Sequence, residues 1–243
     1  MSEVERPAFY AARPGGWRDW WTILHFPYTV WHLSYVAIGA CLAPEVSGRR
    51  LAGTALSFFL AVGIAAHALD EVHGHPLGTR ISNRTLWVTT LLGMAGALAV
   101  GVIGIEEIGP WLIAFMVIGP VLVFGYNAEM FGGRLHTDVG FAVSWGAFPV
   151  LTAYFAQAET VGIAAVLGAA AAFGLSYAQR TLSTPARTLR RKTRHVAGSV
   201  TLADGSVVPL DAAILRAPLE RALLAMSWSM AALAAALIVA RLG

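Results

Sequence analysis

Residues 86–105 read LWVTTLLGMAGALAVGVIGI, a run of twenty residues without one charged side chain. A helix needs about 20 mainly apolar residues to cross the hydrocarbon core of a bilayer. This stretch therefore predicts a transmembrane helix. Six further stretches have a similar length and character, and they lie at 21–43, 51–69, 110–128, 140–157, 161–178 and 220–241. The sequence thus predicts an all-α, polytopic transmembrane helix bundle with about seven spans.

The composition of the 243-residue chain favours the same class. Hydrophobic residues make up 57% and charged residues only 13%, whereas a typical soluble domain is roughly 45–50% apolar and about 25% charged. So little charge cannot cover a soluble globule of this size. Cys41 is the only cysteine, which excludes an internal disulfide scaffold. In a membrane protein the net charge of +3 relates to orientation, so we expect no nucleic-acid partner.

The basic residues predict how the chain crosses the membrane. With a cytoplasmic N-terminus, fourteen of the 17 Lys and Arg residues lie inside, and only Arg49, Arg50 and Arg241 lie outside. Cytoplasmic loops carry such an excess of Lys and Arg. We therefore expect a multi-pass protein with its N-terminus in the cytoplasm and its C-terminus outside. Three tryptophans at 17–21 suit an aromatic belt at the cytoplasmic interface.

Four parts are expected along the chain: a cytoplasmic N-terminal segment at 1–20, a six-span bundle at 21–178, a cytoplasmic insert at 179–216 and a final transmembrane helix at 217–243. The insert contains a basic run from Arg187 to Arg194. It continues into two β-rich runs around Asp204-Gly205, which predict a small hairpin. The basic run either enforces the topology or binds anionic lipid headgroups or a phosphate-bearing substrate.

Polar residues of the expected spans gather toward one end. The first span places His25, Tyr28, His32 and Tyr35 on one helical face. The second, fourth and sixth spans end on the same side with polar or ionisable groups. Such groups are costly inside a membrane and commonly mark function, so their convergence predicts a polar cavity open to the cytoplasm. His32 either hydrogen-bonds to a neighbouring helix or points into this cavity as a ligand or base.

Two clusters at that end have the character of metal ligands. His67, Asp70 and Glu71 can share one helical face, and His73 and His75 follow in the next loop. One imidazole and two carboxylates on one face can hold a divalent cation.

The second cluster follows the fourth span and consists of Glu129, His136 and Asp138. The two clusters together predict a two-metal site, which suits displacement of a phosphate-type leaving group. The alternative is that these residues only solvate helix ends at the water interface.

The phrase HPLGTRISNRTL at 75–86 resembles the loop after the first aspartate-rich motif in the UbiA superfamily of intramembrane prenyltransferases. The upstream stretch AAHALDEV at 65–72 resembles the Asn-Asp-x-x-Asp motif of that superfamily. The second polar loop, from Tyr126 to Gly140, matches the layout of the superfamily in outline. The resemblance covers roughly residues 18–157, by the order of the spans.

This resemblance implies a helical bundle in which Mg²⁺ ions hold the diphosphate of a prenyl donor and an acceptor traps the allylic cation. By position, Asp70 matches the second aspartate of the first motif, and His67 stands where the first belongs. The candidate catalytic residues are Asp70, Glu71, Asp138 and His32. The candidate metal ligands are His67, Asp70, Glu71, His73, Glu129, His136 and Asp138. The candidate substrate-binding residues are Arg80, Arg84, Tyr126, Asn127 and Arg134.

Histidines in the place of aspartates change the expected chemistry. Mg²⁺ prefers oxygen ligands, whereas imidazole suits transition metals. Beside a prenyl-transferring or cyclising enzyme, two alternatives therefore stay open. One is a histidine-rich membrane enzyme that uses Fe, Mn or Zn on a lipid or quinone. The other is a non-catalytic protein that binds a prenyl lipid. Membrane lipids and an isoprenoid or other lipid substrate are the expected partners.

Overall fold

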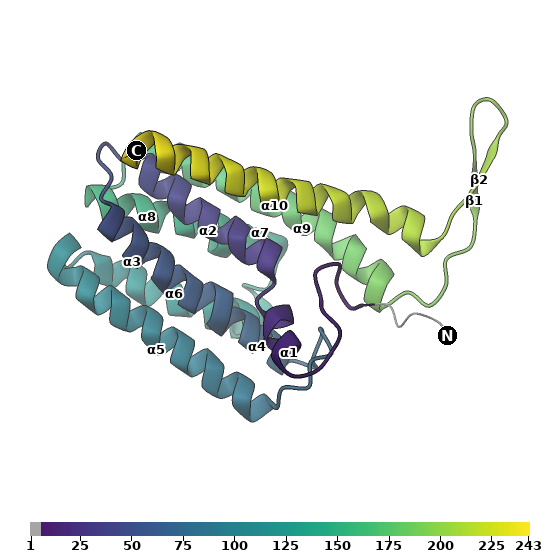
Figure 1. Ribbon diagram of the computed structural model, residues 1–243, viewed down its shortest axis with the longest axis horizontal. Coiled ribbons are helices and arrows are strands. Elements are labelled where there is room, and N and C mark those ends of the chain that lie inside the picture. The colour runs from purple at the N-terminus through teal and green to yellow at the C-terminus, as the bar shows by residue number, and fades with distance from the viewer. Residues whose placement is uncertain (1–5) are drawn as a thin grey trace.

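The computed structural model describes residues 6–243 and is mostly helical (Figure 1). Its helices are α1 (Trp17–Ile23), α2 (Phe26–Cys41), α3 (Gly48–Phe58), η1 (Phe59–Ala66), α4 (His67–Val72), α5 (Asn83–Ile108), α6 (Leu112–Asn127), η2 (Phe131–Gly133), α7 (Asp138–Ala142), η3 (Val143–Ala147), α8 (Phe148–Ala158), α9 (Ile163–Arg191) and α10 (Ala212–Leu242). Two short strands, β1 (Ser199–Thr201) and β2 (Val207–Pro209), pair antiparallel. The mostly helical class expected from the sequence is confirmed.

Four helical runs are long and apolar enough to cross a membrane: Gly48–Val72, Asn83–Ile108, Asp138–Ala158 and Ala212–Leu242. The shorter apolar helix α6 lies antiparallel to α5, across a short turn at Gly109. These helices support a membrane protein. Figure 1 shows the long helices side by side along one common direction, with α5 at one edge and α10 at the opposite edge.

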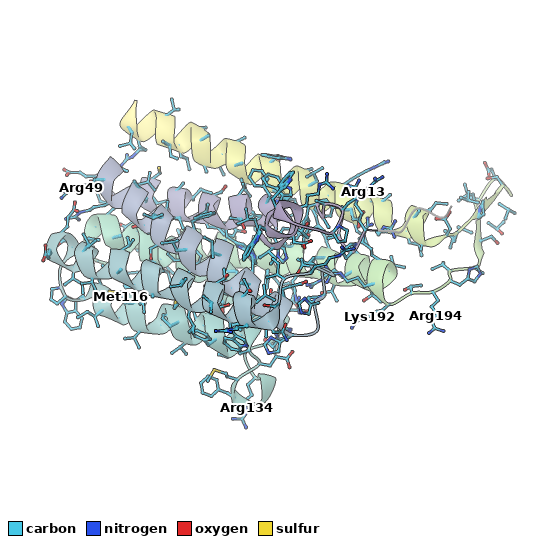
Figure 2. All side chains as sticks on the ribbon, turned by 60° about the horizontal axis from the view of Figure 1, so that its bottom comes forward. Arg13, Arg49, Met116, Arg134, Lys192 and Arg194 are labelled. Atoms are coloured by element: carbon cyan, nitrogen blue, oxygen red, sulfur yellow. The ribbon has the colours of Figure 1, made fainter. Side chains whose placement is uncertain are left out.

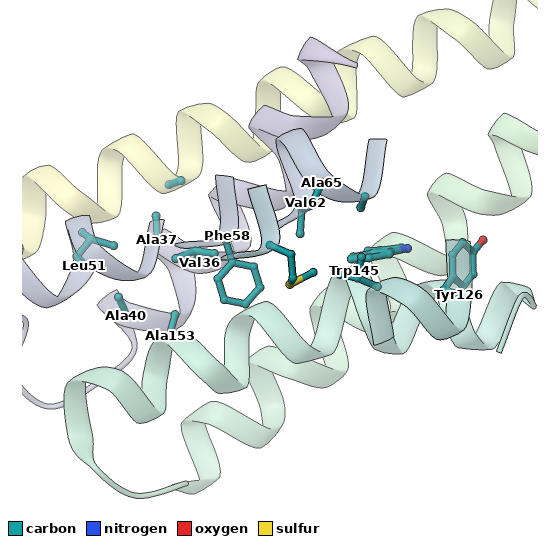
Figure 3. Packing of buried hydrophobic residues seen from close by; sticks show 14 of the residues in the cluster. Val36, Ala37, Ala40, Leu51, Phe58, Val62, Ala65, Tyr126, Trp145 and Ala153 are labelled. Carbon is teal, nitrogen blue, oxygen red and sulfur yellow. The ribbon is translucent and has the colours of Figure 1, made fainter. Parts of the chain in front are cut away.

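The helices of the bundle approach one another closely at glycines. A Cβ added to Gly39 of α2 would lie 2.4 Å from the carbonyl oxygen of Val150 in α8. Close helix contact through such small residues is typical of membrane bundles. Phe58 and Trp145 pack in the main apolar cluster, with residues from several helices (Figure 3). The core therefore forms between helices that are far apart in the sequence.

Two of the long helices contain a π-helical segment, η1 and η3. Such segments widen the helix and commonly occur at functional sites. Segment η1 leads directly into His67, and segment η3 contains Trp145. Both residues line the cavity described below.

The structure departs from the expected boundaries in two places. The first apolar stretch is divided, because His25 adopts a left-handed backbone conformation (φ 45°) between α1 and α2, and Pro27 sits in the first turn of α2. Helix α9 continues well past residue 178, to Arg191. The start of the basic run is therefore helical and not part of a separate insert. The predicted hairpin around Asp204-Gly205 is present.

Charged side chains close the end of the bundle that carries the α2–α3, α5–α6 and α8–α9 connections. Arg50 donates to the main-chain carbonyls of Glu107, Ala156 and Gln157, and its guanidinium lies 3.0 Å from the Glu159 carboxylate. We call this end the clamp end. Figure 2 shows Arg49 at the clamp end and Arg13, Arg134, Lys192 and Arg194 toward the other end, which we call the cavity end.

Candidate functional site

A polar cavity of about 280 Å³ lies at the cavity end. Its walls come from α2, η1, α4, α6, η3, α9 and α10, and residues 7–10 of the N-terminal segment cover one side. The ionisable groups that line it are His25, His32, His67, Asp70, Glu71, His73, Glu129, His136, Arg180, Arg187, Arg190, Arg191 and Glu220, together with Tyr10, Tyr28 and Tyr126. Four arginines face this space, and all of them belong to α9.

The arginines share one face of α9 because Arg180, Arg187 and Arg191 are seven and four residues apart, which is close to two turns and one turn of helix. Arg180 contacts the Asp138 carboxylate at 2.9 Å and lies over the Phe141 ring. This carboxylate partly neutralises the guanidinium at that end of the row.

The other arginines have different partners. Arg190 donates two hydrogen bonds to the Glu220 carboxylate, at 2.7 and 2.6 Å. Arg191 donates to the carbonyl oxygen of Pro7 at 2.8 Å. The Nε of Arg187 donates to the carbonyl oxygen of Ser183 at 3.3 Å, and no carboxylate of residues 6–243 forms an ion pair with this guanidinium. Arg187 is therefore the cavity cation best able to receive an anionic ligand.

The Glu71 carboxylate is fully engaged in holding the loop after α4. It is completely buried and accepts hydrogen bonds from the main-chain N–H of Leu77 and Thr79 and from the Thr79 hydroxyl, at 2.8–3.0 Å. His75 lies 3.4 Å away. Since its lone pairs face these donors, Glu71 fixes the loop rather than presenting oxygens to a metal ion.

The histidines of the first cluster are spread over different partners. His67 packs its ring on His25, with the centroids 4.2 Å apart, and its Nδ1 is 3.5 Å from the Thr29 hydroxyl. His73 contacts the Leu69 carbonyl in its own helix. Asp70 lines the cavity. The expected convergence of these side chains on one ion is not seen.

His32 both hydrogen-bonds to a neighbouring helix and lines the cavity. Its Nδ1 lies 2.9 Å from the carbonyl oxygen of Trp145, which requires the N–H on that nitrogen and joins α2 to η3. The ring also lines the cavity, so Nε2 is left as the acceptor nitrogen.

The second cluster is also dispersed. The His136 ring stacks on Tyr126 at 4.6 Å, and its Nδ1 contacts the Tyr126 carbonyl. The Glu129 side chain is 65% exposed and only approaches His136 at 4.0 Å, while Asp138 pairs with Arg180. Within residues 6–243, no three His, Cys, Asp or Glu side chains are grouped closely enough to hold a metal ion. The arrangement therefore does not fit the two-metal site that the resemblance implies.

The structure places the expected substrate-binding residues in two groups. Tyr126 and Asn127 line the cavity, as expected. Arg80, Arg84 and Arg134 are exposed and lie outside its lining. The loop that carries Arg80 is turned away because the Glu71 carboxylate holds Thr79 and the buried Asp19 carboxylate holds the Arg80 main-chain N–H at 3.1 Å.

Three of the arginines that line the cavity belong to the basic run from Arg187, for which phosphate binding was one of the two interpretations, but none of the four was among the candidate site residues. The signal that could have found all of them was the helical spacing of Arg180, Arg187 and Arg191. Ending the sixth span at 178 hid that periodicity.

Several buried polar atoms of the cavity lining have no hydrogen-bond partner within the described chain. They are the Nε2 of His25, the hydroxyl of Tyr126, the Nδ2 of Asn127 and the Oε1 of Gln179. Buried polar groups are normally paired. These atoms are therefore suited to a polar ligand or to water inside the cavity.

An apolar groove of about 370 Å³ lies behind the cavity, between α3, η1, α5, α6 and α8. Its lining is mainly aliphatic and aromatic. Val62 of η1 and Trp145 of η3 line both the groove and the polar cavity, from opposite sides. The two spaces therefore adjoin at these residues. At its far end the groove reaches Arg50 and Glu107 of the clamp end.

Comparisons with protein-family models, with curated proteins and with solved structures give no match to this chain.

Proposed function

We propose that the chain is a membrane enzyme that acts on a prenyl diphosphate or a similar isoprenoid lipid, by prenyl transfer or cyclisation. One observation carries the proposal: a cavity with four arginines and a mainly apolar groove meet at Val62 and Trp145. An isoprenoid diphosphate has the same two parts, a multiply charged anionic head and a hydrocarbon tail, joined at the reacting carbon.

The positively charged arginines of the cavity suit the diphosphate head of such a substrate. Arginine binds phosphate oxygens in a planar, bidentate manner and stays protonated. In this proposal Arg187 makes the main contact with the diphosphate, and Arg191 adds a second one. The unpaired Nδ2 of Asn127 and hydroxyl of Tyr126 are further donors for phosphate oxygens.

The reaction then follows from the placement of the groups. The C–O bond of the allylic diphosphate breaks, and the negative charge on the departing diphosphate is stabilised by the guanidinium groups. The allylic cation beside Trp145 bonds to the acceptor, or to its own double bond in a cyclisation. The Asp70 carboxylate, which lines the cavity, is the base that accepts the released proton.

The proposal includes the UbiA-like architecture and the orientation expected from the sequence. The seven apolar stretches would all cross the membrane, and the cavity end would face the cytoplasm, where most of the basic residues lie. The departure from the superfamily lies in how the diphosphate is held. Because the acidic side chains do not fit a two-metal site, arginine rather than Mg²⁺ carries the charge here.

A non-catalytic protein that binds an isoprenoid lipid is the second candidate. The observation that favours it is that Glu71 and Asp138, two of the candidate catalytic acids, are engaged by neighbouring groups. The same cavity and groove would then hold the lipid without bond cleavage.

The test uses the purified protein in lipid nanodiscs with farnesyl and geranylgeranyl diphosphate, measuring binding and release of inorganic pyrophosphate. We expect micromolar binding that Arg187→Gln weakens by about tenfold or more, the loss of one charge-assisted contact. Arg194→Gln, which changes an exposed arginine outside the cavity, is the matched control and should bind normally. If the protein binds the diphosphate but releases no pyrophosphate in the presence of a panel of hydroxylated aromatic acceptors, the result would favour the second candidate, a non-catalytic lipid-binding protein. Absence of binding, or equal binding by both variants, would refute the proposal.

A further inference from the structure

The N-terminal strap, residues 6–16, crosses the mouth of the polar cavity. Its residues Pro7 to Tyr10 form part of the lining. The strap is fastened to α9, because Arg190 donates to the Arg6 carbonyl at 3.1 Å and Arg191 donates to the Pro7 carbonyl. The strap is thus a cover over the cavity that is held by two of the cavity arginines.

The inner face of the strap combines small and aromatic side chains. Ala8 and Ala11 are buried against Leu77 of the loop after α4. Tyr10 packs its ring on Tyr28 and His25. Because residues 6–16 form no helix or strand, opening of the strap would break side-chain contacts but no helical or sheet hydrogen bonds.

The strap ends at a flexible joint. Gly15 and Gly16 have φ values of 124° and 61°, which L side chains rarely adopt. The Asp19 carboxylate accepts from the Gly15 N–H at 2.8 Å, and the Thr22 hydroxyl accepts from the Ala12 N–H at 3.0 Å. Helix α1 therefore anchors the strap, and the position of α1 decides where the strap lies.

The outer face of the strap is basic. Together with α1 it forms a shallow notch, which is lined by Arg6, Ala12, Arg13, Trp17, Arg18 and Trp21. No acidic residue lines the notch within the described chain. The Asp19 carboxylate of the same helix is buried on the opposite face. Arg13 and Arg18 are exposed, and no described residue forms an ion pair with them.

The tryptophans place this notch at the membrane surface. Trp17 is 72% exposed, although α1 buries its other face. Trp21 stacks on Phe26 at 5.1 Å, and Phe26 contacts Trp228 of α10 at 6.3 Å. A continuous row of exposed aromatic rings across α1, α2 and α10 is typical of the level of the lipid headgroups. Three arginines at that level would face the phosphate groups of the leaflet.

We propose that the notch binds the headgroup phosphate of an anionic phospholipid, and that a lipid held there keeps the strap closed over the polar cavity. Arg13 and Arg18 bind the phosphate from the strap and from α1, so the lipid joins the two segments. The membrane composition would thereby control access to the cavity. This inference does not rest on the proposed reaction.

The experiment measures strap closure directly. Ala11→Cys is introduced into a Cys41→Ala background, and labelling by a water-soluble maleimide is timed in nanodiscs. One set contains phosphatidylcholine alone, and the other contains phosphatidylcholine with one fifth phosphatidylglycerol. Because Ala11 is 1% exposed in the closed strap, labelling reports opening. We expect phosphatidylglycerol to slow labelling by about fivefold or more, the effect of a surface arginine on anionic lipid.

The controls separate the sources of the anion. Arg13→Gln with Arg18→Gln should abolish the protection, Arg13→Lys with Arg18→Lys should keep most of it, and Arg194→Gln should change nothing. Equal labelling in the two nanodiscs would overturn the proposal, as would equal protection by inorganic phosphate in phosphatidylcholine alone. A loss of protection in the Arg194 variant would show that the effect is general surface charge. If Ala11→Cys does not fold, Ala8→Cys reports on the same face of the strap.

Discussion

Arg50 at the clamp end and Arg187 at the cavity end differ in how fully their guanidinium groups are hydrogen-bonded. At the clamp end, Arg50 finds three main-chain carbonyls and the Glu159 carboxylate within 3.3 Å. At the cavity end, the hydrogen bond that Arg187 forms within residues 6–243 goes to the Ser183 carbonyl. Polar atoms without partners in the described chain also collect at the cavity end.

The difference in hydrogen bonding indicates that the clamp end contributes to stability and the cavity end to ligand binding. A buried cation whose hydrogen bonds are complete holds segments together and has little capacity left for a ligand. A cation and several polar atoms with incomplete hydrogen bonding raise the energy of the empty site and favour a ligand that completes them. The clamp end thus maintains the fold, and the cavity end is where we expect chemistry.

The largest expected effect on stability comes from Glu71. This residue is an exception to the comparison, because it lies at the cavity end but its hydrogen bonds hold the fold together. Glu71→Gln replaces one of the two acceptor oxygens by an N–H₂ group, which then faces either the Leu77 N–H or the Thr79 donors. It should lower the free energy of unfolding by about 2–3 kcal/mol. The measurement is unfolding in mixed detergent–SDS micelles. Glu129→Gln, which changes an exposed carboxylate of the same cavity, is the control and should have no such effect. Equal stability of the two variants would contradict the role given to Glu71.

The next effect tests the clamp end. Arg50→Gln should lower the free energy of unfolding by about 2 kcal/mol, since it removes hydrogen bonds from a charged donor to buried carbonyls. It should weaken farnesyl diphosphate binding far less than Arg187→Gln does, because Arg50 lies at the end of the groove that is far from the cavity. Arg49→Gln, whose side chain is 80% exposed and pairs with Glu107, should cost less than about 1 kcal/mol. A loss of ligand affinity in Arg50→Gln at unchanged stability would reverse the assignment of the two ends.

A smaller effect, on the affinity for the diphosphate, is expected for Asp138→Asn, and the direction of the change distinguishes two roles of Asp138. As a metal ligand, Asp138 would be needed for binding, and Asp138→Asn would weaken it. As the partner of Arg180, Asp138 offsets a cavity charge, and Asp138→Asn should strengthen diphosphate binding by about threefold, in line with a partly exposed ion pair. Isothermal titration with and without Mg²⁺ measures this change. Weaker binding of the variant in the presence of Mg²⁺ would favour the metal-ligand role.

The sequence predicted the helical class, the hairpin and the polar end of the bundle because these follow from local patterns. Apolar stretches of spanning length, an Asp-Gly turn and polar residues at matching span ends all appear within short windows. The partners of Glu71 and Asp138 could not be predicted in this way. The role of Glu71 depends on how the following loop folds, because the loop brings the N–H groups of Leu77 and Thr79 back to its carboxylate. The role of Asp138 depends on a contact with Arg180 of α9, which lies 42 residues away in the sequence.

The smallest effect concerns Tyr10, at the point where the strap meets the cavity. Burial raises the pKa of Tyr10 to about 12, although the charges of Arg191 and Arg187 oppose this. The unfolded chain has a Tyr pKa near 10, so the folded state favours the neutral phenol. Its contribution to stability is complete below pH 10 and declines as the pH rises toward 12. Tyr10→Phe removes this titration but keeps the ring contacts with Tyr28 and His25. The melting temperatures of wild type and Tyr10→Phe in nanodiscs should therefore run parallel from pH 6 to 9. Above pH 10 the melting temperature of the wild type should fall faster, and parallel curves throughout would show that the strap does not bury Tyr10 against Tyr28 and His25.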